Sequence, residues 1–408
     1  MEFPVLRRLL TLASFLLVAL WASSVPRVLA APTFDLRGTA GLEARGFPED
    51  GAAPAQSAGD LSVRLAPELH ASVADGRAHL VFSPWYRQDG SDRRRTHFDL
   101  RELAFEYATE QWETRIGVRR VFWGVAESNH LVDVINQTDA VENPDQEDKL
   151  GQPMLNLAYV RPWGTLDVFV LPWFRERTFP GRRGRLRGGF VVDPALTRYE
   201  SRAAEHHVDV ALRYAFHGAG FDVGLSQFRG TSREPLLVPM RSAGGRPALA
   251  ADYRQIDQTG LDAQFTLDSW LLKLEALHRT GMGPGYAALV AGFEYTQVGL
   301  AGSAFDLGWL VEVHWDQRGK QATTIFNHDV FAGLRLALND AAGSTLLAGV
   351  LTDVTHGGVF GNLEAERRFG ERWKAELQLR LFASEARADL LQAVDRDTYL
   401  GFALDRYF

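Results

Sequence analysis

The stretch Phe305-Asp306-Leu307-Gly308-Trp309-Leu310-Val311-Glu312-Val313-His314-Trp315 alternates between two kinds of side chain. Its odd-numbered positions carry Phe, Leu, Trp, Val, Val and Trp, whereas its even-numbered positions include Asp, Glu and His. Successive side chains of a β-strand point to opposite faces, so this stretch has one apolar and one polar face. An alternating strand of about nine to eleven residues is long enough to cross a bilayer within a tilted β-barrel. The stretch therefore predicts a transmembrane β-strand.

The same alternation recurs from residue 34 to the C-terminus and gives about eighteen candidate strands. They lie near 34–45, 61–73, 78–87, 96–108, 112–123, 153–161, 165–174, 203–217, 220–230, 253–267, 270–280, 286–299, 304–315, 326–338, 344–355, 358–369, 373–384 and 397–408. This pattern predicts an all-β fold, a closed antiparallel transmembrane β-barrel of about 18 strands, with about 16 as the alternative. The apolar phase changes inside 96–108, where a β-bulge would absorb the slip.

Short and long connections alternate between these strands. Turns such as 74–76, 217–220 and 370–372 are short, whereas 46–60, 124–152, 175–202, 231–252, 316–325 and 385–396 are long. Bacterial outer-membrane barrels have short periplasmic turns and longer extracellular loops. We therefore expect both termini of the mature chain to lie in the periplasm.

The N-terminal residues have the features of a secretory signal peptide. Arg7 and Arg8 precede the apolar run 9–21, and the small residues around Ala30 suit cleavage before Ala31. We expect residues 1–30 to be the signal peptide and 31–408 to form the barrel. After residue 30 no apolar stretch approaches the roughly 20 residues of a transmembrane helix. The chain has no Cys, and its net charge of −7 argues against nucleic acid as a partner.

Several aromatic residues lie near the ends of the predicted strands, as in the girdles at the two membrane interfaces of such barrels. They include Trp112, Trp163, Trp173, Trp270, Trp309, Trp315 and Trp373. The chain ends in Phe408 on an alternating strand, which resembles the assembly signal of Gram-negative outer-membrane proteins, although Arg406 departs from it. We therefore expect the cell outer membrane as location, with outer-membrane lipid and the barrel-assembly machinery as partners.

Residues 119–153 contain three distinctive series, Trp123-Gly124, Asn136-Gln137-Thr138-Asp139 and Lys149-Leu150-Gly151-Gln152-Pro153. In these series the chain resembles an uncharacterised family of proteobacterial outer-membrane β-barrels with porin-like architecture. The resemblance extends over roughly residues 115–190. It implies an outer-membrane location and a porin-like body, and it implies no particular substrate.

The long connection 124–152 combines many carboxylates with an apolar set that an exposed loop does not need. General porins fold a long loop inward to narrow the channel, and this connection follows the fifth predicted strand. An inward fold would bury the apolar set on the inner wall and leave the carboxylates facing the pore; the alternative is a solvated acidic loop over the mouth. The apolar residues are Val125, Leu131, Val132, Val134 and Ile135. The candidate constriction residues are Glu127, Asp133, Asp139, Glu142 and Asp145.

The opposite charges are expected on the pore wall. The alternation places Arg115, Arg119, Arg213, Arg335 and Arg380 on the lumen face, since Arg facing lipid at the midplane costs about 2–4 kcal/mol. Barrels of about 16 to 18 strands enclose more space than side chains fill, which favours a channel. A barrel plugged by structural ion pairs is the alternative.

A second long connection carries six Arg within residues 175–187. Arg clusters bind phosphate groups, so lipopolysaccharide contact is one interpretation, with Arg182, Arg183, Arg185 and Arg187 as the candidates. This connection could instead bend inward toward the acidic connection 124–152, or it could be a solvated basic loop.

No catalytic constellation stands out. His206, His207 and Asp209 form the densest group, but on a strand His206 would face away from the other two. We expect no enzyme activity, no metal and no cofactor. The expected function is a porin-like outer-membrane channel for passive diffusion of small hydrophilic solutes, and a homo-oligomer remains open. The alternative is a barrel of envelope biogenesis or export whose loops bind lipopolysaccharide or a protein partner.

Overall fold

Eighteen strands form one antiparallel sheet in the computed structural model, which describes residues 32–73, 76–386 and 389–408. The first half of the wall contains β1 (Thr33–Gly46), β2 (Gly59–Val73), β3 (Ala78–Asp89), β4 (His97–Ala108), β5 (Trp112–Arg119), β6 (Gln152–Arg161), β7 (Gly164–Leu171), β9 (Asp209–Gly218) and β10 (Phe221–Thr231). The second half contains β13 (Gln255–Leu267), β14 (Trp270–Thr280), β15 (Tyr286–Gln297), β16 (Asp306–Asp316), β17 (His328–Ala337), β18 (Thr345–Asp353), β19 (Val359–Phe369), β20 (Trp373–Ala383) and β21 (Tyr399–Tyr407). The predicted all-β barrel and its strand number are confirmed.

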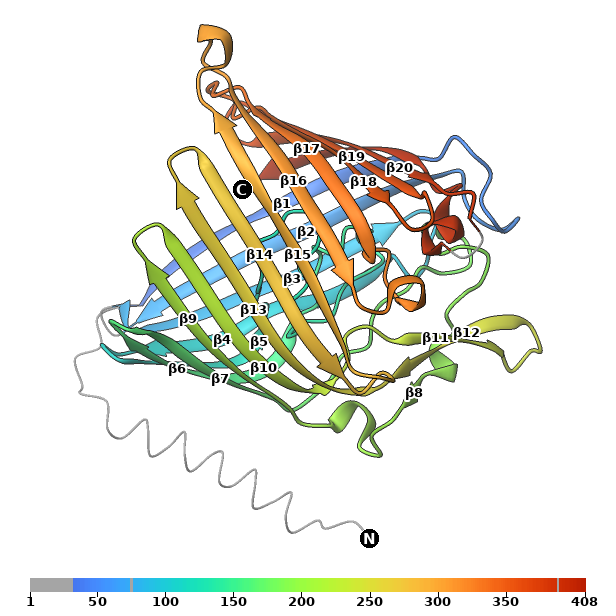
Figure 1. Cartoon of the computed structure of the whole chain (residues 1–408), viewed down its shortest axis with the longest axis horizontal. Helices are drawn as coiled ribbons and strands as arrows, with labels where there is room; N and C mark the ends of the chain where they lie inside the picture. The colour runs from blue at the N-terminus through green and yellow to red at the C-terminus, as the bar shows by residue number, and fades with distance from the viewer. Residues whose placement is uncertain (1–31, 74–75, 387–388) are drawn as a thin grey trace.

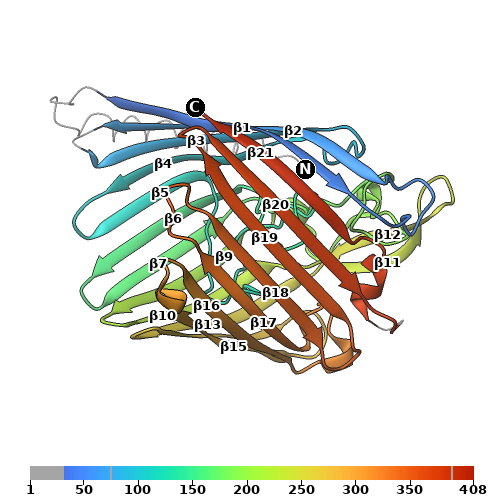
Figure 2. The ribbon, with the colours of Figure 1, turned by 90° about the horizontal axis from the view of Figure 1, so that it is seen from above.

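The sheet closes because its last strand pairs with its first. β21 runs antiparallel to β1, with Thr39 opposite Tyr407 and Gly46 opposite Leu400. Each wall strand otherwise pairs with its neighbours along the chain, so the strands wind around one barrel (Figures 1 and 2). The predicted signal peptide, residues 1–30, lies outside the described residues.

The alternation of each strand separates lipid-facing from lumen-facing side chains. On β16, Trp309, Val313 and Trp315 are exposed on the outer surface, whereas Glu312 and His314 are buried on the inner one. All seven tryptophans that the sequence assigned to the girdles are more than 40 % exposed, as expected for rings at a membrane interface. Within the described residues, no helix has the length and apolar character needed to cross a membrane.

The two ends of the barrel differ. Short turns and both described termini lie at one end, which we call the turn end, on the left of Figure 1. The long connections lie at the other end, the loop end, where β8 (Arg198–Tyr199), β11 (Leu236–Arg241) and β12 (Pro247–Tyr253) form a separate three-stranded sheet. Short 3₁₀ helices, such as Leu390–Val394, also lie among these connections.

The predicted irregularity within 96–108 is a β-bulge. Ser83 of β3 pairs with Glu102 of β4, but the next residue, Pro84, pairs with Leu100. Arg101 is therefore the extra residue on β4, and its side chain is buried in the lumen. The bulge changes which positions face lipid, so that Phe98 and Leu103 both lie outside.

Candidate functional site

The segment 120–151, between β5 and β6, is folded into the barrel; we call it the inner segment. Val132, Val134 and Ile135 are fully buried together with Trp123. They pack against the inner wall formed by Met154, Phe169, Leu171, Ala211, Phe228 and Ile256. The connection therefore folds inward and is not a solvated loop over the mouth of the barrel. Its apolar residues cover the inner face of β6, β7, β9, β10 and β13.

Two wall carboxylates hold the backbone of the inner segment. Glu275 on β14 accepts hydrogen bonds from the N–H groups of Val125, Ala126 and Val132, at 2.6, 2.8 and 3.1 Å. Glu312 on β16 accepts from the N–H groups of Glu127 and Ser128 at 2.7 and 2.9 Å. Backbone N–H groups that are packed against the wall, away from water, need such partners. The inner segment is thus fastened at several points of the wall.

Two of the predicted constriction carboxylates meet predicted wall arginines. Glu127 pairs with Arg335 of β17 at 2.6 Å, and Asp145 pairs with Arg380 of β20 at 3.1 Å. Both contacts lie at the edge of the inner segment that faces β17–β20. This edge is opposite the apolar contact with β6–β13, so the inner segment crosses the lumen.

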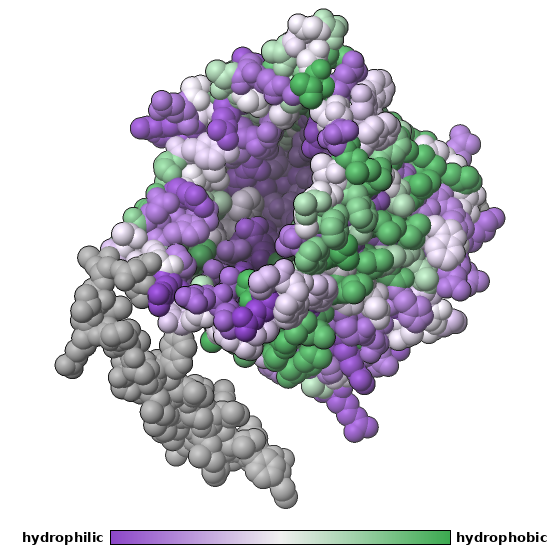
Figure 3. All heavy atoms as spheres, turned by 60° about the vertical axis from the view of Figure 1, so that its left-hand side comes forward, coloured by the Kyte–Doolittle hydropathy of each residue, from purple (hydrophilic) through white to green (hydrophobic). Residues whose placement is uncertain are grey.

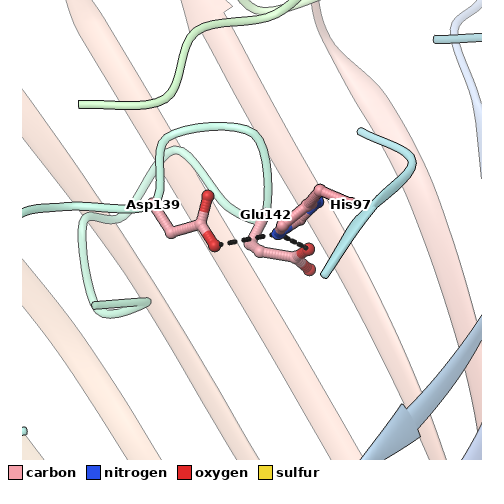
Figure 4. Close-up of side chains that lie close together, drawn as sticks. All are labelled: His97, Asp139 and Glu142. Carbon is pink, nitrogen blue, oxygen red and sulfur yellow. Dashed lines mark hydrogen bonds and ion pairs between the residues drawn. The ribbon is translucent and has the colours of Figure 1, made fainter. Parts of the chain in front are cut away.

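Asp139 and Glu142 lie deeper in the segment, beside His97 of β4 (Figure 4). His97 Nε2 lies 3.1 Å from Asp139 and 3.5 Å from Glu142. Arg101 also contacts Asp139 at 2.7 Å, and Arg87 contacts Glu142 at 2.6 Å. Although burial alone raises the pKa of Asp139, the hydrogen bond with His97 and the positive charge of Arg101 outweigh it and lower that pKa to about 2.

The spacing of His97, Asp139 and Glu142 would suit a cation, but their bonds do not. His97 Nδ1 faces the carbonyl oxygen of Arg95 at 3.0 Å while Nε2 faces the carboxylates, so both ring nitrogens are directed at acceptors. The carboxylate oxygens accept from Arg101 and Arg87. A metal ion needs free lone pairs on its ligands, and the bonds at this cluster occupy them. The cluster fastens the inner segment to β3 and β4.

The remaining predicted site residues are paired elsewhere. Asp133 is buried and contacts Lys149 at 3.1 Å within the inner segment. On the wall, Arg213 binds Asp262 through two bonds of 2.7 and 2.8 Å, and it also lies over the ring of Trp123. Arg115 contacts Asn156 at 2.9 Å, and Arg119 contacts Glu106 at 3.2 Å. These three arginines balance wall carboxylates or polar groups and do not oppose the constriction carboxylates.

Two of the cavities that border the inner segment adjoin each other. One, of about 580 Å³, opens among the connections at the loop end. The other, of about 360 Å³, lies between the inner segment and the wall of β17–β20; we call it the chamber. The two share His130, Pro144, Asp145, Ile325 and Phe382 as lining residues. From the turn end, the barrel presents a deep hollow lined by hydrophilic residues (Figure 3).

The arginine-rich connection is divided between two environments. Arg182 and Arg183 are exposed, whereas Arg185 is buried in an ion pair of 2.6 Å with Asp397 and is not free to contact lipopolysaccharide. Arg187 donates to carbonyl oxygens of its own loop, including Gly181 at 2.8 Å. Thr178 bends toward the inner segment and donates to Asp139 at 2.6 Å. The connection therefore combines the inward and the exposed arrangements that the sequence left open.

Several residues that hold the inner segment, among them Arg101, Arg87 and Glu275, were not singled out from the sequence. Arg101 occupies the bulge, where the alternation changes phase and no longer indicates a face. Arg87 lies on β3 beyond the register shift that this bulge produces. Glu275 shares the phase of Arg279 on β14, which the alternation does assign to the lumen, so this signal was present in the sequence.

Several solved structures of outer-membrane proteins align with most of this chain, but they share little sequence identity with it. Wzi, described as an outer-membrane protein involved in group 1 capsule assembly in Escherichia coli and a carbohydrate-binding β-barrel, has a TM-score of 0.52 and 10 % identity over 92 % of this chain and 84 % of that chain. A Rhodopseudomonas blastica porin mutant has a TM-score of 0.46 and 13 % identity, over 92 % of this chain and 100 % of that one. A loop-deletion mutant of OmpT, an outer-membrane protein of Vibrio cholerae, has a TM-score of 0.47 and 10 % identity, over 93 % and 100 %.

No protein-family model matches the chain, and no curated protein matches it. The likeness to Wzi therefore concerns the fold, which is that of an outer-membrane β-barrel. The outer-membrane β-barrel that the sequence resemblance implied is confirmed as a fold, while its sequence family is not identified.

Proposed function

We propose that this chain is an outer-membrane channel for the passive diffusion of small hydrophilic solutes, narrowed by the inner segment. The observation that carries the proposal is the asymmetric position of this segment, which packs against β6–β13 and borders a cavity along β17–β20. A barrel of this strand number encloses more space than side chains alone fill. In this proposal residues 1–30 are removed on export, residues 31–408 form the barrel, and the termini face the periplasm.

Charge selectivity should depend on the carboxylates that border the cavities. Glu127 and Asp145 line the chamber, whereas Asp139 is fully buried against Arg101. Charges on a pore wall act strongly on ions at close range. Replacing Glu127 and Asp145 by Gln and Asn should therefore move selectivity toward anions.

The experiment is a planar-bilayer recording of the purified protein at matched salt. The wild type should conduct, deletion of residues 128–148 should raise its conductance, and the reversal potential in a salt gradient should report the selectivity of each variant. Heat-modifiable migration in gels verifies that every variant is folded. A folded deletion variant that conducts no better than the wild type would remove the inner segment as the constriction.

The second candidate is a barrel of envelope biogenesis or export. It is favoured by the packing of the connections at the loop end, where Arg185 binds Asp397 and the carbonyl oxygens of Glu49 and Ser57. Wzi, with the same fold, is described as acting in capsule assembly and binding carbohydrate. A barrel of this kind, closed by its own loops, should be nearly silent in the same recordings, so conductance separates the two candidates.

A further inference from the structure

The chamber between the inner segment and β17–β20 has two unlike sides. The wall side is mainly apolar, with Phe331, Leu351, Phe360 and Phe382 contributed by four successive strands. Its polar members are Asn362 and Glu364 of β19. The side formed by the inner segment is mainly polar, although Phe122 and Pro144 also belong to it. It presents Glu127, Ser128, His130, Asp145 and Glu147. Such an apolar surface inside a lumen that is otherwise rich in charged side chains needs an explanation.

The aromatic rings on the wall side of the chamber lie close to glycines of the wall or to each other. The far edge of Phe331 covers Gly333 and Gly349, which pair with each other across β17 and β18. A Cβ atom added to Gly349 would lie only 2.4 Å from a ring carbon of Phe331, so the ring occupies space that a side chain would fill. Phe360 and Phe382 are stacked, with ring centroids 5.3 Å apart. Together these rings form an aromatic surface that borders the chamber.

The charges of the chamber are already paired. Glu127 contacts Arg335 at 2.6 Å, and His130 contacts Glu147 at 2.5 Å. Arg380 joins Asp145 at 3.1 Å and Glu364 at 2.5 Å. An ion entering the chamber would therefore compete with existing partners. A neutral solute could still hydrogen-bond to these groups, because an ionised carboxylate accepts about four hydrogen bonds.

We propose that the chamber is a binding subsite for neutral saccharides. The C–H face of a sugar ring would pack on Phe331, Phe360 and Phe382. Its hydroxyl groups would hydrogen-bond to Glu127 and Asp145 of the inner segment and to Asn362 of β19. The volume of about 360 Å³ falls in the range of small-molecule sites, about 300–1,000 Å³, which combine apolar walls with a few polar groups. The inference rests on the proposed channel, through which the solute would reach the chamber, and it names the chemical class of that solute.

The test measures equilibrium binding of maltotriose to the full-length protein in detergent, together with current interruptions in planar bilayers. Saturable binding is expected for maltotriose and not for polyethylene glycol of similar mass or for tetraethylammonium. Phe331→Leu and Phe360→Leu keep apolar volume but remove the ring face. Each should raise the dissociation constant roughly three- to tenfold, the range of an aromatic contact.

Phe174→Leu is the matched control, because Phe174 is equally a buried aromatic residue but packs with Tyr199 and Tyr253 among the loop-end connections, away from the chamber. It should leave the dissociation constant unchanged. Absence of saturable binding, an equal effect of Phe174→Leu, or equal binding of tetraethylammonium would overturn the subsite. Binding without conductance would overturn the channel and keep the subsite. Conductance without binding would overturn the subsite and keep the channel.

Discussion

At the scale of single residues, Glu275 fastens the inner segment to the wall. Its carboxylate is fully buried and accepts three backbone N–H groups of the inner segment. A buried N–H group without a partner is costly, and a non-helical segment supplies few partners of its own. One side chain of β14 therefore fixes the position of residues 125–132.

Replacing Glu275 with Leu should release the inner segment while the barrel stays folded. Each of the three N–H groups would lose its acceptor, at about 1–3 kcal/mol per group, whereas the ladder hydrogen bonds of the wall are untouched. The measurement is limited proteolysis of the folded barrel, with cleavage expected inside residues 120–151. Glu275→Gln keeps an acceptor oxygen and should be cleaved more slowly. If the Leu variant resists protease as well as the wild type, Glu275 does not hold the segment.

Arg406 shows how a departure from a sequence pattern is accommodated locally. An apolar residue is usual two positions before the terminal Phe, and Arg406 stands there on the outer face of β21. Its guanidinium lies 5.9 Å from the ring centre of Trp373 on the neighbouring strand. This cation–π contact at the turn end keeps the charge near the membrane interface.

At the scale of elements, the arginine-rich connection, residues 175–187, contains both exposed and buried arginines. Arg182 and Arg183 are available to phosphate groups, whereas Arg185 joins three connections at the loop end through Asp397, Glu49 and Ser57. Substitutions within the same connection should therefore have different consequences.

Arg182→Ser with Arg183→Ser should weaken lipopolysaccharide association and leave stability unchanged. The wild-type association should also weaken with added salt, because exposed charges are screened. Arg185→Ser should instead destabilise the loop end, because leaving one partner of a buried ion pair alone costs about 3–5 kcal/mol. Binding to immobilised lipopolysaccharide and protease cleavage within 47–58 measure the two effects. Association that ignores both salt and the double substitution would remove the lipid contact.

The wall strands were predictable because each must alternate over its whole length to separate lipid from lumen. The predicted strand 34–45 is observed as Thr33–Gly46, and 270–280 as Trp270–Thr280. The predicted strand 203–217 begins later, at Asp209, because Ala204–His206 forms a 3₁₀ turn. The hairpin of β11 and β12 was missed: it belongs to a loop, where no bilayer imposes a length, and Pro239 interrupts its pattern.

The site was predictable only in part. The apolar set of 124–152 indicated an inward fold, because those residues had no other surface to cover. The pairing of Glu127 with Arg335 and of Asp145 with Arg380 followed no local rule, since the partners are more than two hundred positions apart in sequence. The partners of Asp139 and Glu142 depend on the bulge at Arg101, whose effect on side-chain direction the alternation does not reveal.

At the scale of the whole molecule, the two ends of the barrel should face different compartments. Gly244, in the turn between β11 and β12, is exposed at the loop end, and Glu371 is exposed at the turn end. An epitope tag at Gly244 should be labelled on intact cells, whereas a tag at Glu371 should require permeabilisation. The opposite labelling would place the termini outside the periplasm.

The closure of the barrel has a further consequence. The first and last strands meet along a single ladder, from Thr39–Tyr407 to Gly46–Leu400. Inside, Arg45 of β1 donates to the carbonyl oxygen of Glu142 at 2.6 Å, and Arg380 of β20 holds Asp145 at 3.1 Å. Residues 142–145 therefore connect β1 to β20 on the inner side of the wall and so span β21, the strand that closes the barrel. A lateral gate between β1 and β21, opening sideways into the lipid, would first have to release this connection.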